Sequence, residues 1–173
     1  MDTDKVDRAR RAKELKSIFE SITNDGHHLV GAERATLFMV DNDTKELWSQ
    51  VATGTDGIIK VPFSRGCVGR SATTGGTLNV PNAYQNPYFD KSFDEQTGYK
   101  TVSVLVVPIL SKNNNAVIGA IQLLNKRSNQ GDEKGSDGTS SGSIIETFTS
   151  EDEKIVKVLA SHVAAFIRIV DGT

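Results

Sequence analysis

The sequence is poor in cysteine and has no long hydrophobic run. Cys67 is the only cysteine among 173 residues, so the chain has no internal disulfide, and this usage is typical of a reducing compartment. No apolar run approaches the roughly 20 residues that a membrane-spanning helix needs, and residues 1–16 are charged rather than apolar. We therefore expect a cytoplasmic protein without a membrane partner.

Neither sign of charge dominates, and histidine is scarce. The 20 basic and 22 acidic residues give a formal net charge of -2, and no basic run resembles the footprint of a nucleic-acid-binding protein. The three histidines are too few for a two-metal phosphohydrolase site. We expect His27 and His28 at a helix end, where they complement the dipole, and His162 in the core. The composition thus predicts no nucleic-acid partner, no metal and no catalysis by this chain.

Both ends of the chain have the hydrophobic spacing of amphipathic helices. The first predicted helix covers residues 5–23 and ends near Asn24-Asp25-Gly26. Its apolar face is formed by Leu15, Ile18, Phe19 and Ile22. The last predicted helix has an apolar face formed by Ile155, Val158, Leu159, His162, Val163 and Phe166.

Short β-rich segments and one short helix, at residues 66–74, are predicted between the terminal helices. The predicted strands are residues 34–40, 46–52, a short strand ending at Val61-Pro62, 78–81, 102–110 and 116–124. The last two are almost continuously apolar, which is typical of central strands that are covered on both faces.

Two further segments are predicted to be irregular. Residues 82–98 are aromatic and polar without clean periodicity, so we expect short helical turns and loops that form a lid. Residues 128–143 contain no apolar side chain and are rich in Gly, Ser and Asp, which predicts a flexible insertion. The simplest fold is of the α+β class, an antiparallel sheet with the terminal helices on one face and the lid on the other.

The end of the last predicted strand and the start of the last helix carry complementary charges. Lys126 follows Asn125 at the strand end, and Asp152 lies in the first turn of the helix, so the two side chains can tie two layers of the fold together. The helix start also matches a capping box, with Ser150 as N-cap and Glu153 at N3. Both roles are compatible.

Asn125-Lys126 and Phe148 to Glu153 together resemble the N-K-F-x-x-x-D-E signature of GAF domains. GAF domains are small-molecule sensor modules of cyclic-nucleotide phosphodiesterases and adenylyl cyclases. In this chain the stretch between Lys126 and Phe148 is longer than the family usually has. The signature residues in this chain are Asn125, Lys126, Phe148, Asp152 and Glu153. We expect them to be structural and to set the shape of a pocket.

The resemblance extends over residues 61–84 and 86–101, which are similar to the segments that lead into the pocket and close over the ligand in phosphodiesterase-type GAF domains. The expected ligand-binding residues are Thr36, Thr53, Cys67, Val68, Gly69, Phe89, Asp94, Thr97, Thr101 and Gln122. Gly66 and Gly69 permit close approach of backbone N–H groups to a phosphate, or they serve only a tight turn. Asp94 and Thr97 also suit ordinary turn and cap positions. Gln122 lies in an apolar strand and needs a partner, either a ligand or a neighbouring backbone group.

The resemblance implies a regulatory domain, not itself an enzyme, of a larger cyclic-nucleotide phosphodiesterase whose catalytic domain would be its partner. One cGMP-selective relative has an aromatic residue and an Asp where this chain has Ala52 and Thr53, so the expected ligand is cAMP rather than cGMP. Residues 1–30 would form an N-terminal helix and residues 31–170 the GAF domain, with a homodimer through the terminal helices. The alternative is a dimerisation or protein-interaction module that binds no nucleotide.

Overall fold

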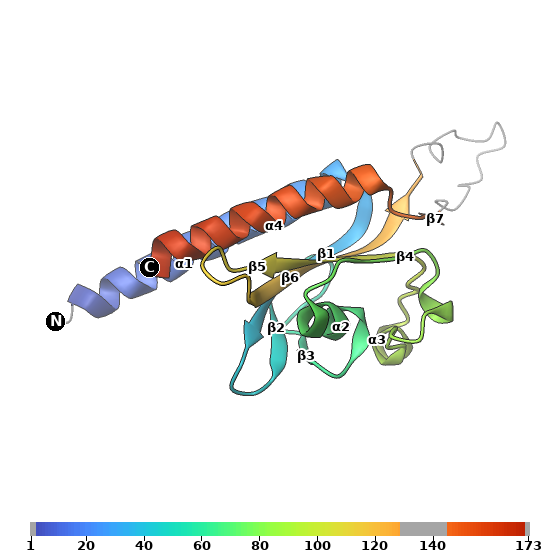
Figure 1. The fold of residues 1–173 in the computed structure, drawn as a ribbon, viewed down its shortest axis with the longest axis horizontal. Coiled ribbons are helices and arrows are strands. Elements are labelled where there is room, and N and C mark those ends of the chain that lie inside the picture. Colours follow the sequence, from blue (N-terminus) through green and yellow to red (C-terminus); the bar gives the residue numbers. More distant parts are fainter. Residues whose placement is uncertain (1–2, 129–144, 172–173) are drawn as a thin grey trace.

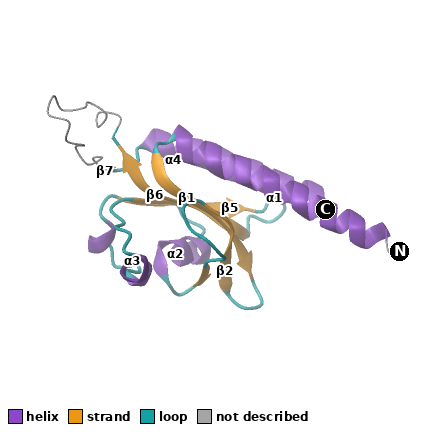
Figure 2. Ribbon diagram, turned by 180° about the vertical axis from the view of Figure 1, so that it is seen from behind, coloured by secondary structure: helices purple, strands orange, loops and turns teal. Residues whose placement is uncertain are grey.

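The terminal helices lie side by side on one face of the sheet (Figures 1 and 2). The computed structural model describes residues 3–128 and 145–171. Helix α1 spans Thr3–Leu29 and helix α4 spans Ser150–Asp171. The N-terminal part of α1 extends beyond the C-terminal end of α4 (Figure 1).

Helix α1 does not end where the sequence predicts. It continues through Asn24-Asp25-Gly26 to Leu29, and the chain turns at Gly31, whose φ is 66°. A Cβ atom on Gly26 would lie 2.8 Å from the Leu159 Cδ1 atom of α4. Gly26 therefore marks the close approach of two helices rather than a helix end. His27 and His28 lie in the last turn of α1, as predicted.

The seven described strands form one antiparallel sheet in the order β3-β2-β1-β6-β5-β4, with β7 paired to β6. Their bounds are β1 Ala32–Asp41, β2 Glu46–Ala52, β3 Lys60–Pro62, β4 Leu78–Val80, β5 Val104–Leu110, β6 Val117–Arg127 and β7 Ile145–Glu146. The predicted fold class is confirmed, and β7 is the strand that the sequence did not predict. The predicted insertion at residues 128–143 lies outside the described residues except for Ser128.

The opposite face of the sheet carries helix α2 (Gly66–Thr74), the short 3-10 helix η1 (Ala83–Gln85) and helix α3 (Ser92–Thr97). Buried side chains form two clusters, one on each face of the sheet. Along β5, Leu105 packs in the cluster beneath α1 and α4, whereas Val106 packs in the cluster beneath α2 and the lid. This alternation confirms that β5 is covered on both faces.

The buried face of α4 is rotated relative to the predicted one. Val156, Ala160 and Val163 are buried, whereas Val158 is 54% exposed and His162 is also exposed. The prediction of a core position for His162 is therefore wrong, because the neighbouring Val163 faces the sheet. In the part of the chain that the structure describes, neither long helix has the hydrophobicity needed to cross a membrane.

Candidate functional site

A cavity of ≈ 110 Å³ lies between the sheet and the layer formed by α2 and the lid. Its floor comes from β1, β3, β5 and β6 and from the loop that follows β2, and its roof comes from the N-terminal turn of α2 and the lid segment 89–101. The predicted ligand-binding residues that line it are Thr36, Thr53, Cys67, Val68, Phe89, Asp94, Thr101 and Gln122.

Gly69 and Thr97 are the two predicted ligand-binding residues that do not line the cavity. A Cβ atom on Gly69 would lie 2.7 Å from the carbonyl oxygen of Phe63, so this glycine lets α2 pack against the preceding loop. Thr97 is exposed, and its hydroxyl donates a hydrogen bond to the Phe93 carbonyl oxygen at 2.8 Å. In this structure both residues serve local packing.

The floor of the cavity is polar at one place. Thr36 on β1 and Gln122 on β6 are register partners on neighbouring antiparallel strands, so their side chains stand side by side on the same face. The Gln122 side-chain amide is partly buried and borders the cavity, and within the described residues it has no hydrogen-bond partner. Thr53 lies next to them, and its hydroxyl oxygen accepts a hydrogen bond from the Ala35 N–H at 2.8 Å. One lone pair of Thr53 is thus occupied, while its O–H hydrogen remains able to donate.

Asp94 is buried and bound to the rest of the lid. One carboxylate oxygen accepts hydrogen bonds from the Thr101 N–H at 2.7 Å and from the Tyr84 hydroxyl at 3.0 Å. The other oxygen accepts from the Thr101 hydroxyl at 2.8 Å. Burial of the Tyr84 hydroxyl and its bond to Asp94 raise the pKa of Tyr84. Asp94 therefore connects α3 to the segment that enters β5 and holds the lid together.

Asp90 is the second carboxylate at the cavity, and it is also engaged. It pairs with the Arg65 guanidinium at 2.6 Å and accepts a hydrogen bond from the Ser92 N–H at 3.0 Å. Burial alone would raise the pKa of Asp90, but the hydrogen bonds from Ser92 and the charge of Arg65 outweigh it and lower the pKa. Both cavity carboxylates are thus already engaged by protein groups.

The sequence analysis missed Arg34, which also lines the cavity. Its guanidinium carbon lies 3.8 Å from the ring centroid of Tyr99, an arrangement that favours a cation–π interaction. The Tyr99 hydroxyl in turn donates to Glu33 at 2.8 Å. Burial, followed by this hydrogen bond, raises the pKa of Tyr99. Arg34 lies two residues before Thr36 on the same strand, so the period-2 alternation of β-strands was the signal that could have found it.

Cys67 contributes a small apolar wall rather than a reactive group. The side chain is buried, and burial raises the pKa of its thiol to about 11. Since the thiolate is the reactive form, the thiol stays protonated and inert at neutral pH. Across residues 3–128 and 145–171 no cluster of His, Cys, Asp and Glu is arranged to hold a metal ion.

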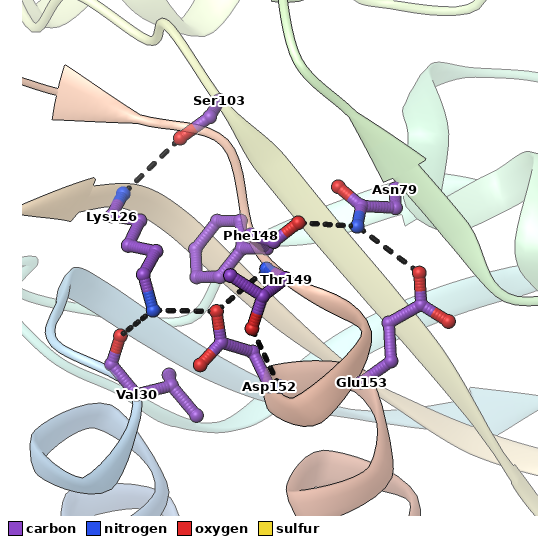
Figure 3. Close-up of polar contacts among 8 residues, drawn as sticks. All are labelled: Val30, Asn79, Ser103, Lys126, Phe148, Thr149, Asp152 and Glu153. Atoms are coloured by element: carbon purple, nitrogen blue, oxygen red, sulfur yellow. Dashed lines mark hydrogen bonds and ion pairs between the residues drawn. The ribbon is translucent and has the colours of Figure 1, made fainter.

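The predicted tie between strand end and helix is present (Figure 3). The Lys126 ammonium lies 2.5 Å from an Asp152 carboxylate oxygen and 3.2 Å from the Val30 carbonyl oxygen. Only 16% of the Lys126 side chain and 8% of the Asp152 side chain are exposed. The ion pair therefore joins the end of β6, the end of α1 and the start of α4.

The capping box at the start of α4 is shifted by one residue from its predicted position. The Thr149 hydroxyl accepts a hydrogen bond from the Asp152 N–H at 3.2 Å, and Asp152 accepts from the Thr149 N–H at 2.7 Å. The prediction of Ser150 as N-cap with Glu153 at N3 is wrong, because Asp152 serves both the cap and the ion pair. Glu153 instead accepts a hydrogen bond from Asn79 on β4 at 3.0 Å, and Asn79 also donates to the Phe148 carbonyl at 2.8 Å (Figure 3).

Asn125 fastens the end of the lid to the end of β6. Its side-chain oxygen accepts from the Val102 N–H at 2.7 Å, and its amide donates to the Lys100 carbonyl at 2.8 Å. Its φ is 56°, a conformation that Asn tolerates better than most side chains. The asparagine of the signature thus joins the lid to the strand that carries Lys126.

Comparison with protein families gives a direct match. The family model described as the GAF domain matches residues 14–167. The chain belongs to the GAF domain family.

Two curated relatives of this GAF domain are named as cyclic-nucleotide phosphodiesterases. The chain is 33% identical over 125 residues to the "Probable 3',5'-cyclic phosphodiesterase pde-5" of Caenorhabditis elegans, covering 65% of this chain and 17% of the relative. It is 35% identical over 142 residues to the "Dual 3',5'-cyclic-AMP and -GMP phosphodiesterase 11A" of Takifugu rubripes, covering 75% of this chain and 14% of the relative. The chain thus corresponds to a small part of each relative.

Solved structures share the fold. The GAF domain of a phosphoenolpyruvate-protein phosphotransferase from Coxiella burnetii superimposes with a TM-score of 0.73 at 17% identity, covering 96% of this chain and 94% of the other. A free methionine-R-sulfoxide reductase from Neisseria meningitidis superimposes with a TM-score of 0.66 at 16% identity, covering 99% and 95%. At these identities the likeness shows the fold alone.

Proposed function

We propose that this GAF domain binds a cyclic nucleotide between sheet and lid, as a regulatory domain of a cyclic-nucleotide phosphodiesterase. The observation that carries the proposal is the cavity between sheet and lid, with the Thr36 hydroxyl and the Gln122 side-chain amide on its floor. The Gln122 side chain is partly buried, so its amide can bind the donors and acceptors that a nucleotide base offers. The phosphodiesterase relatives support the same class of ligand.

The charges around the cavity suit an anion. Arg34 lines the cavity, whereas Asp90 and Asp94 are engaged by other protein groups. The N-terminus of α2 borders the cavity, and no side chain caps it. A helix N-terminus carries unsatisfied N–H donors and a partial positive charge, which stabilise a phosphate. A cyclic phosphate therefore meets favourable charge at this end of the cavity.

The ligand that we propose is cAMP rather than cGMP. Thr53 keeps its O–H hydrogen as a donor, and the Ala35 N–H occupies one of the two lone pairs of its oxygen. Adenine N1 is an acceptor and matches that donor, whereas guanine carries a hydrogen at N1 and needs an acceptor such as a free carboxylate. Asp90 and Asp94, the carboxylates that line the cavity, are both engaged.

Binding requires the lid to move. A cavity of ≈ 110 Å³ is smaller than the about 300 Å³ at which pockets for small molecules typically begin. We therefore infer that the lid opens outward to admit the nucleotide and closes on a larger volume. The lid is joined through Asn125 and the Lys126–Asp152 pair to α4, so a change in the lid biases the terminal helices.

Substitutions on the cavity floor test this proposal. Gln122→Leu and Thr36→Val remove polar groups at similar volume, and each is expected to weaken cAMP binding about tenfold, which corresponds to the about 1.4 kcal/mol of one lost hydrogen bond. Gln50→Leu on β2, outside the cavity lining, is the matched control and keeps the parent affinity. Equal affinity of all three variants in a titration with labelled cAMP, with cGMP as competitor, would exclude this cavity as the binding site.

The second candidate function is a GAF module that binds no nucleotide and only dimerises or contacts other proteins. The observation in its favour is the exposure of large apolar side chains on the terminal helices, including Ile169 at 73% and Val6 at 62%. We propose a homodimer through α1 and α4 under either function. Sedimentation equilibrium of the chain is expected to give twice the monomer mass, and a monomer at high concentration contradicts the dimer.

A further inference from the structure

A second hollow lies next to the cavity on the outer side of α2. This hollow, which we call the outer groove, has a volume of ≈ 720 Å³ and is open to solvent. Its lining consists of Lys45, Phe63, Ser64, Arg65, Gly66, Arg70, Thr73, Pro87, Tyr88, Phe89 and Asp90. Three of these residues, Gly66, Phe89 and Asp90, also line the cavity. They therefore form a partition between the cavity and the outer groove.

The partition is thin on the side of α2. Gly66 begins the helix with a φ of 71° and has no side chain, and a Cβ atom placed there would lie 3.9 Å from the Cβ atom of Asp90. On the lid side, the Phe89 ring packs on the Tyr84 ring at a centroid distance of 5.4 Å. The separation of cavity and groove thus depends on how segment 89–90 meets the first turn of α2.

One exposed ion pair holds the partition closed. The Arg65 guanidinium pairs with Asp90 at 2.6 Å and donates to the Ser92 hydroxyl at 3.1 Å. The Arg65 side chain is 53% exposed and that of Asp90 is 31% exposed. Ion pairs exposed to this degree stabilise a contact only weakly, because water competes for both charges. The ion pair therefore holds segment 89–90 against the first turn of α2, and it can still break readily.

The outer groove attracts anions. Three cationic side chains, Lys45, Arg65 and Arg70, line it together with Asp90 as the only carboxylate among the lining residues. Arg70 lies over the Tyr88 ring, with its guanidinium carbon 4.7 Å from the centroid. A cleft with an excess of one charge raises the local concentration of oppositely charged ligands and their association rate.

We propose that the outer groove is an anion-binding entrance to the cavity, through which a nucleoside cyclic phosphate passes when the Arg65–Asp90 pair opens. The groove first holds the phosphate by its cationic side chains. Movement of Phe89 and Asp90 away from Gly66 then joins the groove to the cavity. This inference rests on the proposed function, because it assigns the route by which the same ligand reaches the same cavity.

A reversible cross-link across the partition tests the route. The 3.9 Å separation at Gly66 and Asp90 matches the about 3.5–4.5 Å between Cβ atoms in disulfides. Gly66→Cys and Asp90→Cys are combined with Cys67→Ala, which removes the neighbouring thiol. Oxidised and reduced forms of this one protein are then compared, so the strain of a side chain at residue 66 and the loss of the ion pair are common to both forms.

Association and release of radiolabelled cAMP are both measured. The oxidised protein is expected to bind label at least about 100-fold more slowly than the reduced protein, and protein loaded before oxidation is expected to retain its label until a reductant is added. Equal exchange rates in the two forms overturn the proposal, since the ligand then uses another route. Loss of label during oxidation also overturns it, because the cross-link then distorts the site instead of closing an entrance. The Gly66→Cys, Cys67→Ala variant with oxidant is the control for nonspecific oxidation.

Failure of the proposed function gives a different result. In that case the parent chain itself binds neither cAMP nor cGMP, and both proposals fall together. If the parent binds and the cross-linked protein exchanges freely, only the entrance is wrong.

The cationic side chains have a separate kinetic test. Lys45→Gln and Arg70→Gln together are expected to lower the association rate of cAMP about tenfold at low ionic strength, with little change in the dissociation rate. The difference disappears at high salt, where exposed charges are screened. Lys112→Gln together with Lys154→Gln, two residues that do not line the outer groove, is the control of equal charge change. An unchanged association rate in the double variant contradicts an anion-attracting entrance.

Discussion

At the scale of single residues, Asp94 and Thr101 have a role that differs from the expected one. Both were expected to contact the ligand, and both line the cavity, but they bind each other through two hydrogen bonds. Their polar groups therefore stabilise the closed lid in the absence of ligand. A ligand contact from Asp94 would have to share an oxygen that already accepts from the protein.

Replacing Thr101 tests the role in the lid. Thr101→Val removes the hydroxyl that donates to the Asp94 carboxylate, and the ligand-free protein is expected to lose about 1–3 kcal/mol of unfolding free energy. Urea denaturation without nucleotide measures this loss. A variant with parent stability but impaired cAMP binding would show instead that Thr101 acts only on the ligand.

The Lys126–Asp152 pair is the polar contact for which we expect the largest effect on stability. Lys126→Met or Asp152→Leu alone leaves a poorly hydrated charge without its partner, so each is expected to cost about 3–5 kcal/mol. The double variant is expected to cost much less than the sum, because no charge is then left unpaired. Additive costs in urea denaturation would mean that the two side chains act independently.

The buried Cys67 thiol is expected to make the free energy of unfolding fall at alkaline pH. Its pKa is about 11 in the folded chain against an ordinary value of 9.0, so unfolding between pH 9 and pH 11 releases a proton. Stability from this group is complete below pH 9 and falls as pH rises toward 11. The native thiol is expected to resist alkylation at pH 8 and to react after denaturation. Cys67→Ala is expected to flatten this part of the stability profile, and rapid alkylation of the native protein contradicts burial of the thiol.

At the scale of elements, the local sequence was sufficient to predict the end of a helix where a single residue determines the backbone conformation there. Helix α2 has its predicted bounds because Gly75 adopts a left-handed conformation, with a φ of 69°, directly after it. Helix α1 passes its predicted end because the glycine at position 26 is required by contact with Leu159, which a local reading of the sequence does not contain. The shifted capping box has a similar reason, since Asp152 is held by Lys126 from a distant strand.

The cavity-lining residues could be predicted from the sequence where they lie on strands, because the alternation of side chains along a strand determines which of them face the cavity. Thr36 and Gln122 line it because they are register partners on neighbouring strands, and Arg34 follows from the same alternation. The engagement of Asp94 by Thr101 was not predictable, because it depends on the irregular path of the lid. The ion pair of Arg65 with Asp90 likewise joins two loops that carry no periodic signal.

The close packing of helix α2 at Gly69 predicts that a larger side chain at this position destabilises the protein. A Cβ atom on Gly69 would lie 2.7 Å from the Phe63 carbonyl oxygen and 2.8 Å from that of Pro62, so Gly69→Ala must shift α2 or the loop. We expect a loss of about 1–3 kcal/mol in thermal or urea unfolding. Gly76→Ala meets only the Thr74 hydroxyl at 3.4 Å and serves as the matched control with a small effect. Equal stability of the two variants would mean that α2 is loosely packed.

At the scale of the whole molecule, a continuous set of polar contacts leads from the lid to the terminal helices. Asn125 binds the backbone at Lys100 and Val102, and the adjacent Lys126 binds Asp152 in α4 and the Val30 carbonyl after α1. The lid and the terminal helices lie on opposite faces of the sheet (Figure 2). Polar contacts of Asn125 and Lys126 at the end of β6 connect them. A ligand that prefers one lid position therefore also biases the helices.

The most direct test of the central claim is calorimetric titration of the 173-residue chain with cAMP and with cGMP. The account predicts saturable binding of one cAMP per chain with micromolar or tighter affinity, weaker binding of cGMP, and a rise in unfolding free energy of about 2.7 kcal/mol at a cAMP concentration 100 times the dissociation constant. Absence of binding heat together with an unchanged unfolding temperature for both nucleotides would contradict it.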